Sequence, residues 1–312
     1  MAPTISVKHD TFELPGSPPL FAQSWSPPSE VRGAIGIVHG LGEHSGRYAP
    51  LAERFAQAGF RVVTYDQRGH GRTAGKRGDV PSYEVLLDDL EVLLAEMATG
   101  DASLPKFLFG QSFGGALALN FALRRYEKVG LAPSGRASSP REASSCEVPV
   151  PIFSPPFRRQ LSLNGIIASS PLLLPTHPPP RWKQLAARCL QRVCPSFRFR
   201  TGVQAETLSH DPAVVAAYKA DPLVHAWVSA RWAVAMLDAG QWALEHAAQL
   251  AVPALLLHGT SDPITYPQGT IDFAQRAAHA CTLHTFAGLY HELHWEQERN
   301  QVFEVILDWL EQ

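Results

Sequence analysis

Short apolar runs alternate with longer amphipathic runs along most of the chain. The runs at 33–40 and 106–110 are continuous and apolar, which is typical of buried parallel strands. Residues 83–98 instead carry apolar side chains at helical spacing. This alternation of strand and helix predicts an α/β protein built on a mostly parallel sheet flanked by helices.

The pattern predicts an eight-stranded sheet with a helical cap. Strands are expected near residues 4–9, 19–25, 33–40, 60–66, 106–110, 164–170, 252–258 and 281–286. Helices are expected near residues 48–58, 83–98, 113–126 and 296–311. Residues 171–245 interrupt the alternation, because they are helical and rich in Trp and Ala, and they indicate a cap inserted after the sixth strand. The predicted domains are therefore a core made of residues 1–170 and 246–312 and a cap at 171–245.

Residues 131–160 do not fit this alternation, because they are crowded with Pro, Ser, Gly and Arg and have no periodicity. A structureless connection of this length is uncommon in a compact domain. It joins the end of a helix to the start of a strand, so it should lie opposite the ligand-binding ends of the strands. We predict a disordered insertion remote from the chemistry. A second interpretation is that the segment is translated non-coding sequence.

Composition narrows the class of protein. The chain has 312 residues, 45% of them hydrophobic, and a formal net charge of −2, which does not favour a nucleic-acid partner. The start of the chain lacks a signal-peptide pattern, and no apolar run is long enough to span a bilayer. Four cysteines without metal-ligand spacing are typical of a reducing compartment, namely Cys146, Cys189, Cys194 and Cys281. We therefore expect a soluble cytoplasmic protein.

The segment Gly110-Gln111-Ser112-Phe113-Gly114 carries the strongest chemical signal. It is a G-x-S-x-G motif directly after a predicted buried strand and directly before a predicted helix, which is the context that a nucleophile elbow requires. Gly110 and Gly114 permit a sharp turn whose close approach leaves no room for side chains. The motif predicts that Ser112 is the nucleophile of a serine hydrolase.

A serine hydroxyl needs an adjacent base, and in folds with this motif the chain order is nucleophile, acid, histidine. Asp262 follows the end of a predicted strand, and His291 lies in the loop after the last strand, so we predict that they are the acid and the base. His294 is the competing base, although its spacing from His291 suits the start of a helix and favours a structural role. Asp211 and Asp221 are weaker candidates for the acid, because both lie in the cap.

The tetrahedral intermediate of acyl transfer needs two preorganised backbone N–H groups. We expect one from Phe113, directly after the nucleophile, and one from Leu41, in the loop after the strand at 33–40. Neighbouring polar residues are interpreted mainly as a network that holds these loops rather than as substrate contacts, namely Glu43, His44, Arg47, Asp66, Arg68 and His70. A metal site made of His39, His44 and His70 is disfavoured because it lacks ligand spacing, and no metal or cofactor is expected.

Six segments, in this order along the chain, resemble the monoacylglycerol lipase and lysophospholipase branch of the α/β hydrolases, which includes the serine aminopeptidase S33-like hydrolases. They are HGLGEHSGRY (39–48), YDQRGHGRTAGKRG (65–78), GQSFGG (110–115), ADPLV (220–224), HGTSDPIT (258–265) and GLYHELHWE (288–296). The resemblance implies an α/β-hydrolase fold, a Ser112–His291–Asp262 triad, an oxyanion hole of the Leu41 and Phe113 N–H groups, and no cofactor. The chain departs from the family pattern in the segment 131–160 and in the three prolines at 178–180.

The activity implied by this resemblance is the hydrolysis of single-chain lipid esters, above all monoacylglycerols. Alternatives are a lysophospholipase, a short-chain carboxylesterase, a proline-type aminopeptidase and a non-catalytic ligand-binding protein. An aminopeptidase needs acidic groups in the cap to hold the substrate amine, and Glu206 and Asp211 are available, but the cap is apolar and basic. Non-catalytic relatives of such enzymes tend to lose a member of the triad, and all three candidates are present here.

The cap segment 181–193 is predicted to be a basic amphipathic helix. Its apolar positions, at helical spacing, are Trp182, Leu185, Ala186, Cys189, Leu190 and Val193. Its basic residues are Arg181, Lys183, Arg188 and Arg192. We favour packing of the apolar face on the substrate pocket, but peripheral contact with a membrane is the alternative, and the two are compatible.

Overall fold

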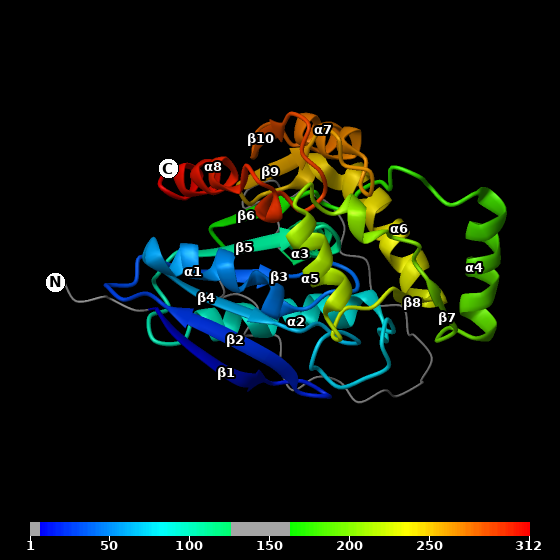
Figure 1. Ribbon diagram of the computed structural model, residues 1–312, viewed down its shortest axis with the longest axis horizontal. Helices are drawn as coiled ribbons and strands as arrows, with labels where there is room; N and C mark the ends of the chain where they lie inside the picture. The colour runs from blue at the N-terminus through cyan, green and yellow to red at the C-terminus, as the bar shows by residue number, and fades with distance from the viewer. Residues whose placement is uncertain (1–6, 126–162) are drawn as a thin grey trace, which may run out of the picture.

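The computed structural model describes residues 7–125 and 163–312 (Figure 1). The predicted insertion at 131–160 lies outside the described residues. Within the described part of the chain, no helix is long and apolar enough to cross a membrane.

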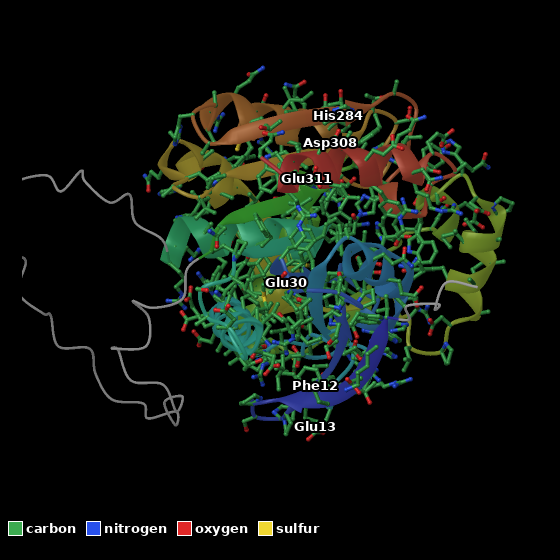
Figure 2. All side chains as sticks on the ribbon, turned by 90° about the vertical axis from the view of Figure 1, so that its left-hand side faces the viewer. Phe12, Glu13, Glu30, His284, Asp308 and Glu311 are labelled. Carbon is green, nitrogen blue, oxygen red and sulfur yellow. The ribbon has the colours of Figure 1, made fainter. Side chains whose placement is uncertain are left out.

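The core is an eight-stranded sheet in the order β1-β2-β4-β3-β5-β6-β9-β10. Its strands are β1 (Lys8–Leu14), β2 (Leu20–Ser26), β3 (Gly33–Val38), β4 (Phe60–Tyr65), β5 (Lys106–Gln111), β6 (Gly165–Ser169), β9 (Ala254–Gly259) and β10 (Cys281–Phe286). Pairing is parallel from β4 to β10, and antiparallel where β1 meets β2 and β2 meets β4. Figure 2 shows Phe12 and Glu13 on β1 at one edge and His284 on β10 at the other. The mostly parallel eight-stranded sheet is confirmed.

The first strand was predicted near residues 4–9, of which residues 4–6 lie outside the described residues, and the described strand extends further along the chain, to Leu14. The strand begins at Lys8 and pairs with β2 so that Lys8 lies opposite Ser26 and Leu14 opposite Leu20. Most of its side chains are exposed, and Leu14 is the one that is buried. Hydrophobic periodicity is therefore weak there, and the pairing with β2 sets the limits of the strand.

Helices cover both faces of the sheet and form two apolar cores. On one face lie α1 (Ala49–Gln57) and α8 (Arg299–Leu310), whose buried side chains pack with those of the central strands. On the other lie α2 (Tyr83–Met97), α3 (Phe113–Arg125) and α7 (Pro267–Arg276). Helix α7 was not predicted, although Pro267 in its first turn is a typical sign of a helix start.

The segment between β6 and β9 forms the cap. It contains α4 (Arg181–Val193), β7 (Arg198–Arg200), α5 (Pro212–Ala220), β8 (Trp227–Ser229) and α6 (Ala230–His246). Helix α6 packs on α3 of the core, and α4 packs on α6 at the outer end of the molecule (Figure 1). The cap is therefore not helical throughout, because β7 and β8 pair as a short antiparallel ribbon.

Candidate active site

Ser112 lies at the sharp turn between β5 and α3. Its φ is 54°, in the left-handed region that costs a residue other than glycine free energy, and its side chain is buried except for a small exposed fraction. A Cβ on Gly110 would lie 2.6 Å from the Gly115 amide nitrogen, and one on Gly114 would lie 2.6 Å from the His39 carbonyl oxygen. Both glycines are therefore required by close backbone approach on either side of the serine.

Asp262 and His291 are in contact at the end of the sheet. Asp262 Oδ2 lies 2.7 Å from His291 Nδ1, and both side chains are almost completely buried. The carboxylate also accepts hydrogen bonds from the Ile264 N–H at 2.8 Å and from the Thr265 hydroxyl at 2.7 Å. These bonds fix the carboxylate so that it can hold the imidazole in one orientation.

The charges in this pair stabilise each other. Burial alone would raise the pKa of Asp262, but the charge of His291 and hydrogen bonds from His258 and His291 outweigh it and hold that pKa well below its usual range. Burial alone would lower the pKa of His291, but the Asp262 carboxylate outweighs it and raises that pKa. His291 is therefore a stronger base than an isolated imidazole.

Gln111 connects the turn at Ser112 to the loop that carries His291. Its side-chain amide donates a hydrogen bond to the His291 carbonyl oxygen at 2.9 Å. Within the described part of the chain, the Ser112 hydroxyl makes no hydrogen bond to His291. Bonds of this type are often long until a substrate binds, so the arrangement is compatible with proton transfer between the two groups.

The loop after β3 lies against Ser112 and presents one free amide. A Cβ on Gly40 would lie 3.3 Å from the Ser112 Cβ. The Gly40 N–H donates to Glu43 Oε1 at 2.6 Å and the Gly42 N–H donates to His70 Nε2 at 3.0 Å. Among the described residues, no acceptor is found for the intervening Leu41 N–H.

The Phe113 N–H is free for a different reason. Phe113 is the first residue of α3, and the first amides of a helix have no partner within it. No other described residue accepts a hydrogen bond from it. The two amides that the sequence analysis expected in an oxyanion hole are therefore without an acceptor among the described residues, and one of them follows Ser112 directly.

A buried ionic network holds the loop after β3. Arg47 Nη1 lies 2.6 Å from Glu43 Oε2 and 2.6 Å from Glu292 Oε1, and the Tyr48 hydroxyl donates to Glu43 Oε1 at 2.7 Å. Because Glu43 also accepts the Gly40 N–H, the network links the loop after β3 to Glu292, the neighbour of His291. This arrangement fits a structural role better than direct substrate contact.

The other candidates have partners outside the His291–Asp262 pair. Asp211 caps the start of α5, and Asp221 accepts a hydrogen bond from His44 at 2.8 Å. His294 stacks on Tyr48, and burial lowers the pKa of His294 to about 3. These contacts favour a structural role for His294.

Three side chains that were not predicted support the pair, namely Gln111, His258 and Thr265. His258 Nε2 lies 3.2 Å from Asp262 Oδ2. All three lie inside segments that carry the family resemblance, which was the available signal. No group of three His, Cys, Asp or Glu residues that could hold a metal ion occurs among the described residues. His39 Nε2 and His70 Nε2 already accept backbone hydrogen bonds.

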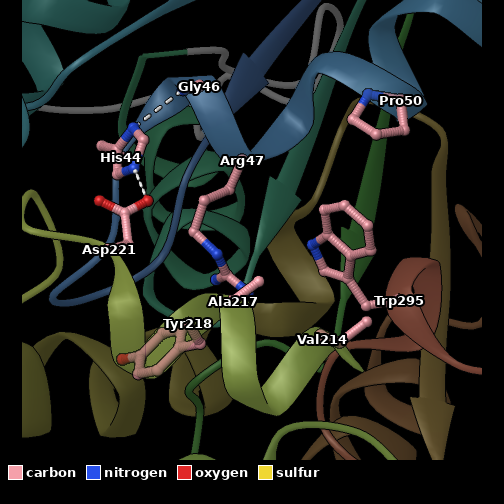
Figure 3. A pocket seen from close by; sticks show the side chains of 9 residues that line it. All are labelled: His44, Gly46, Arg47, Pro50, Val214, Ala217, Tyr218, Asp221 and Trp295. Carbon is pink, nitrogen blue, oxygen red and sulfur yellow. Dashed lines mark hydrogen bonds and ion pairs between the residues drawn. The ribbon is translucent and has the colours of Figure 1, made fainter. Parts of the chain in front are cut away.

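A cavity of about 320 Å³ lies between residues 44–50 and α5 (Figure 3). Arg47 points toward Tyr218, and its guanidinium carbon lies 4.7 Å from the ring centroid. Neither Ser112 nor His291 is among the described residues that line it. The cavity therefore borders the ionic network rather than Ser112 and His291.

The favoured orientation of the cap helix 181–193 was wrong. In the structure α4 has no buried residue, and Trp182, Leu185 and Val193 are 67%, 63% and 86% exposed. Its contacts with α6 use the opposite side, where Arg188 pairs with Asp238. The apolar face therefore points to solvent instead of lining a pocket.

Comparison with known proteins gives a consistent result. The family model described as serine aminopeptidase, S33, matches residues 29–151 and 156–298. A monoacylglycerol lipase of Mycolicibacterium smegmatis is 31% identical over 92% of this chain and 90% of that protein. An uncharacterized abhydrolase domain-containing protein of Dictyostelium discoideum is 31% identical, but the chain spans 28% of its length. A crystal structure of Paleococcus ferrophilus monoacylglycerol lipase is 30% identical, with a TM-score of 0.76 and coverage of 93% of this chain and 98% of that one.

Proposed function

The chain belongs to the serine aminopeptidase S33 family, in the branch of the α/β hydrolases that contains monoacylglycerol lipases, and we propose that it hydrolyses monoacylglycerols through Ser112, His291 and Asp262. The observation that carries the proposal is the buried His291–Asp262 pair beside a strained serine and two free amides. This combination supplies a base, its orienting acid and an oxyanion site at one place.

The proposed reaction uses these groups in order. His291 Nε2 takes the proton of the Ser112 hydroxyl as the serine oxygen attacks the ester carbonyl carbon, and Asp262 stabilises the resulting imidazolium. The Leu41 and Phe113 N–H groups bind the oxyanion, and each such donor typically contributes about 10²–10³ in kcat. The imidazolium then protonates the leaving glycerol oxygen. Water, activated by the same histidine, releases the fatty acid from the acyl-enzyme.

The test compares wild type with Ser112→Ala on monoacylglycerols, lysophospholipids and a p-nitrophenyl ester series. Loss of the nucleophile should lower kcat by about 10⁴-fold or more, because it removes the triad as a unit. Ser103→Ala, an exposed serine in a surface turn, is the matched control and should retain full activity. Equal activity of Ser112→Ala and wild type would overturn the mechanism, and a preference for lysophospholipids would reassign the substrate.

An aminopeptidase activity has less support than ester hydrolysis. Glu206 pairs with Lys219, and Asp211 caps α5 by accepting the Ala213 N–H at 2.9 Å. Both carboxylates that a substrate amine would need in the cap are therefore already engaged.

The exposed face of α4 supports peripheral binding to an anionic membrane. Residues 170–204 contain six Arg or Lys and no Asp or Glu. Trp182 and Leu185 stand on the same helix with most of their surface exposed. Apolar burial and attraction to anionic lipid together favour a helix lying in the interface, with each cation contributing about 1 kcal/mol.

Sedimentation with phosphatidylcholine vesicles, with and without phosphatidylserine, tests this contact. Trp182→Ser/Leu185→Ser should weaken binding about 100-fold or more, because each buried apolar side chain contributes about 1.5–3 kcal/mol and about 1.4 kcal/mol corresponds to a factor of ten. Gln191→Ser on the same helix is the control. Unchanged vesicle binding by the double variant would contradict membrane docking, while hydrolysis of a soluble ester should be the same in all three proteins.

A further inference from the structure

Glu296 is a buried carboxylate outside the proposed catalytic groups. Its side chain has no exposed surface. Oε1 accepts the Tyr290 N–H at 2.7 Å, and Oε2 accepts the His210 N–H at 2.9 Å. The imidazole Nδ1 of His210 lies 2.9 Å from Oε1. One carboxylate thus binds the residue before His291 and a residue of the cap.

Further contacts continue this junction on the other side of His291. The Glu292 N–H donates to the Leu208 carbonyl at 2.8 Å, and the Ser209 hydroxyl donates to the Trp295 carbonyl at 3.0 Å. The His210 ring packs on the Tyr290 ring with centroids 3.7 Å apart. The backbone on both sides of His291 is therefore attached to residues 208–210 of the cap.

A carboxylate is the group that this position requires. Its two oxygens offer about four lone-pair sites, and donors from both segments point at them. A glutamine would offer one oxygen and would turn an NH₂ group toward one of the donors. At least one buried N–H would then lose its acceptor, which typically costs about 1–3 kcal/mol.

We propose that Glu296 is a positioning residue that holds His291 in reach of Ser112 and couples its position to cap residues 208–210. This inference rests on the proposed function, because it concerns the base of the same reaction. Moving a catalytic group by about 1 Å can lower the rate about 100-fold. A cap displaced at residues 208–210 would therefore change the rate of the chemical step as well as access to the site.

The experiment compares Glu296→Gln and His210→Ala with Glu298→Gln, an exposed glutamate two residues away. Active sites are first titrated with a fluorophosphonate, so that rates refer to folded protein. On a soluble p-nitrophenyl ester, Glu296→Gln should lower kcat per site between about tenfold and 100-fold with KM nearly unchanged. His210→Ala, which leaves the backbone bonds in place, should give a smaller fall, and Glu298→Gln should match wild type.

The pH profile supplies a second readout. The charged groups that act on His291 are Asp262, Glu292 and Glu43, and Asp262 dominates in raising its pKa. If His291 shifts away from Asp262, the acid limb of kcat/KM should move to lower pH. A role in stability alone would lower the titrated fraction and the melting temperature without moving that limb.

Two results separate the inference from the proposed function. If kcat per site and the acid limb are unchanged in Glu296→Gln and His210→Ala, the positioning role is wrong while the ester hydrolase remains. If wild type hydrolyses no ester, or Ser112→Ala retains the activity, the proposed function itself is wrong, whatever the results for Glu296→Gln and His210→Ala.

Discussion

Replacing His70 with phenylalanine should slow ester hydrolysis, because the imidazole is the acceptor that holds the Gly42 amide. His70 is completely buried, and its Nδ1 lies 3.1 Å from the Arg68 carbonyl oxygen, so Nδ1 carries the proton and Nε2 is the acceptor. Burial lowers the pKa of His70 well below its usual value, so the ring stays neutral. Phenylalanine is somewhat larger and keeps an aromatic ring against His225 and Trp232, but it accepts no hydrogen bond.

The magnitude follows from the buried N–H that loses its partner. An unsatisfied buried donor costs about 1–3 kcal/mol, and this free energy drives the loop at 39–43 toward other conformations. Since about 1.4 kcal/mol corresponds to a factor of ten, kcat should fall between about fivefold and 150-fold. The upper value approaches the loss of one oxyanion donor, here the Leu41 N–H.

The assay measures kcat and KM per titrated active site, together with the inhibition constant of a trifluoromethyl ketone whose adduct carries an oxyanion. His70→Phe should lower kcat and weaken this inhibitor by similar factors while KM changes little. The control is His225→Phe, which keeps an aromatic ring against His70 and removes the bond to the Gly69 carbonyl, but leaves the Gly42 bond to His70. Normal kcat and inhibitor binding in His70→Phe, with only a lower melting temperature, would refute the reasoning.

Three further predictions concern the triad and the core. Asp262→Asn should lower kcat about 10⁴-fold and move the acid limb of kcat/KM to lower pH. The limb should move because the Asp262 carboxylate raises the pKa of His291, and only the neutral imidazole is a base. An acid limb that stays in place would contradict the assignment of Asp262. Arg68→Met should lower the free energy of unfolding in urea by about 3–5 kcal/mol, because it leaves the buried Asp89 carboxylate, which Arg68 binds at 2.8 Å, without its partner. The double variant Arg68→Met/Asp89→Leu should recover much of this loss. Gly114→Ala should destabilise the fold by about 1–3 kcal/mol, because the new methyl group would overlap carbonyl oxygens at the end of β3; a melting temperature equal to wild type would show that the turn can relax.

The chain order of the elements was predictable because each signal is local. The apolar strand before Gly110 and the helical spacing after Gly114 identify the nucleophile turn without knowledge of the rest of the fold. The eight-stranded sheet followed from the same alternation. The limits of the first strand were not predictable in this way because its side chains are mostly exposed, and periodicity carries information where one face is buried.

The orientation of α4 shows what local pattern leaves open. Amphipathicity identified the helix and its apolar face, but the same pattern serves a helix packed on a pocket and one facing solvent or lipid. The orientation of α4 is set by the packing of its opposite side on α6. This packing involves residues about 50 positions away in the chain, as in the pairing of Arg188 with Asp238.

The sequence by itself determined the sheet, the strand–turn–helix around Ser112 and the choice of Ser112, Asp262 and His291 as candidates. Only the tertiary structure joined His291 to Asp262 and Gln111, left the Leu41 amide free, and placed Glu296 between the histidine loop and the cap. The physical reason is the distance along the chain over which each kind of interaction acts. Strand and helix signals depend on neighbours within a few residues, whereas each of these contacts is a hydrogen bond whose value depends on burial and on the position of a partner elsewhere in the chain.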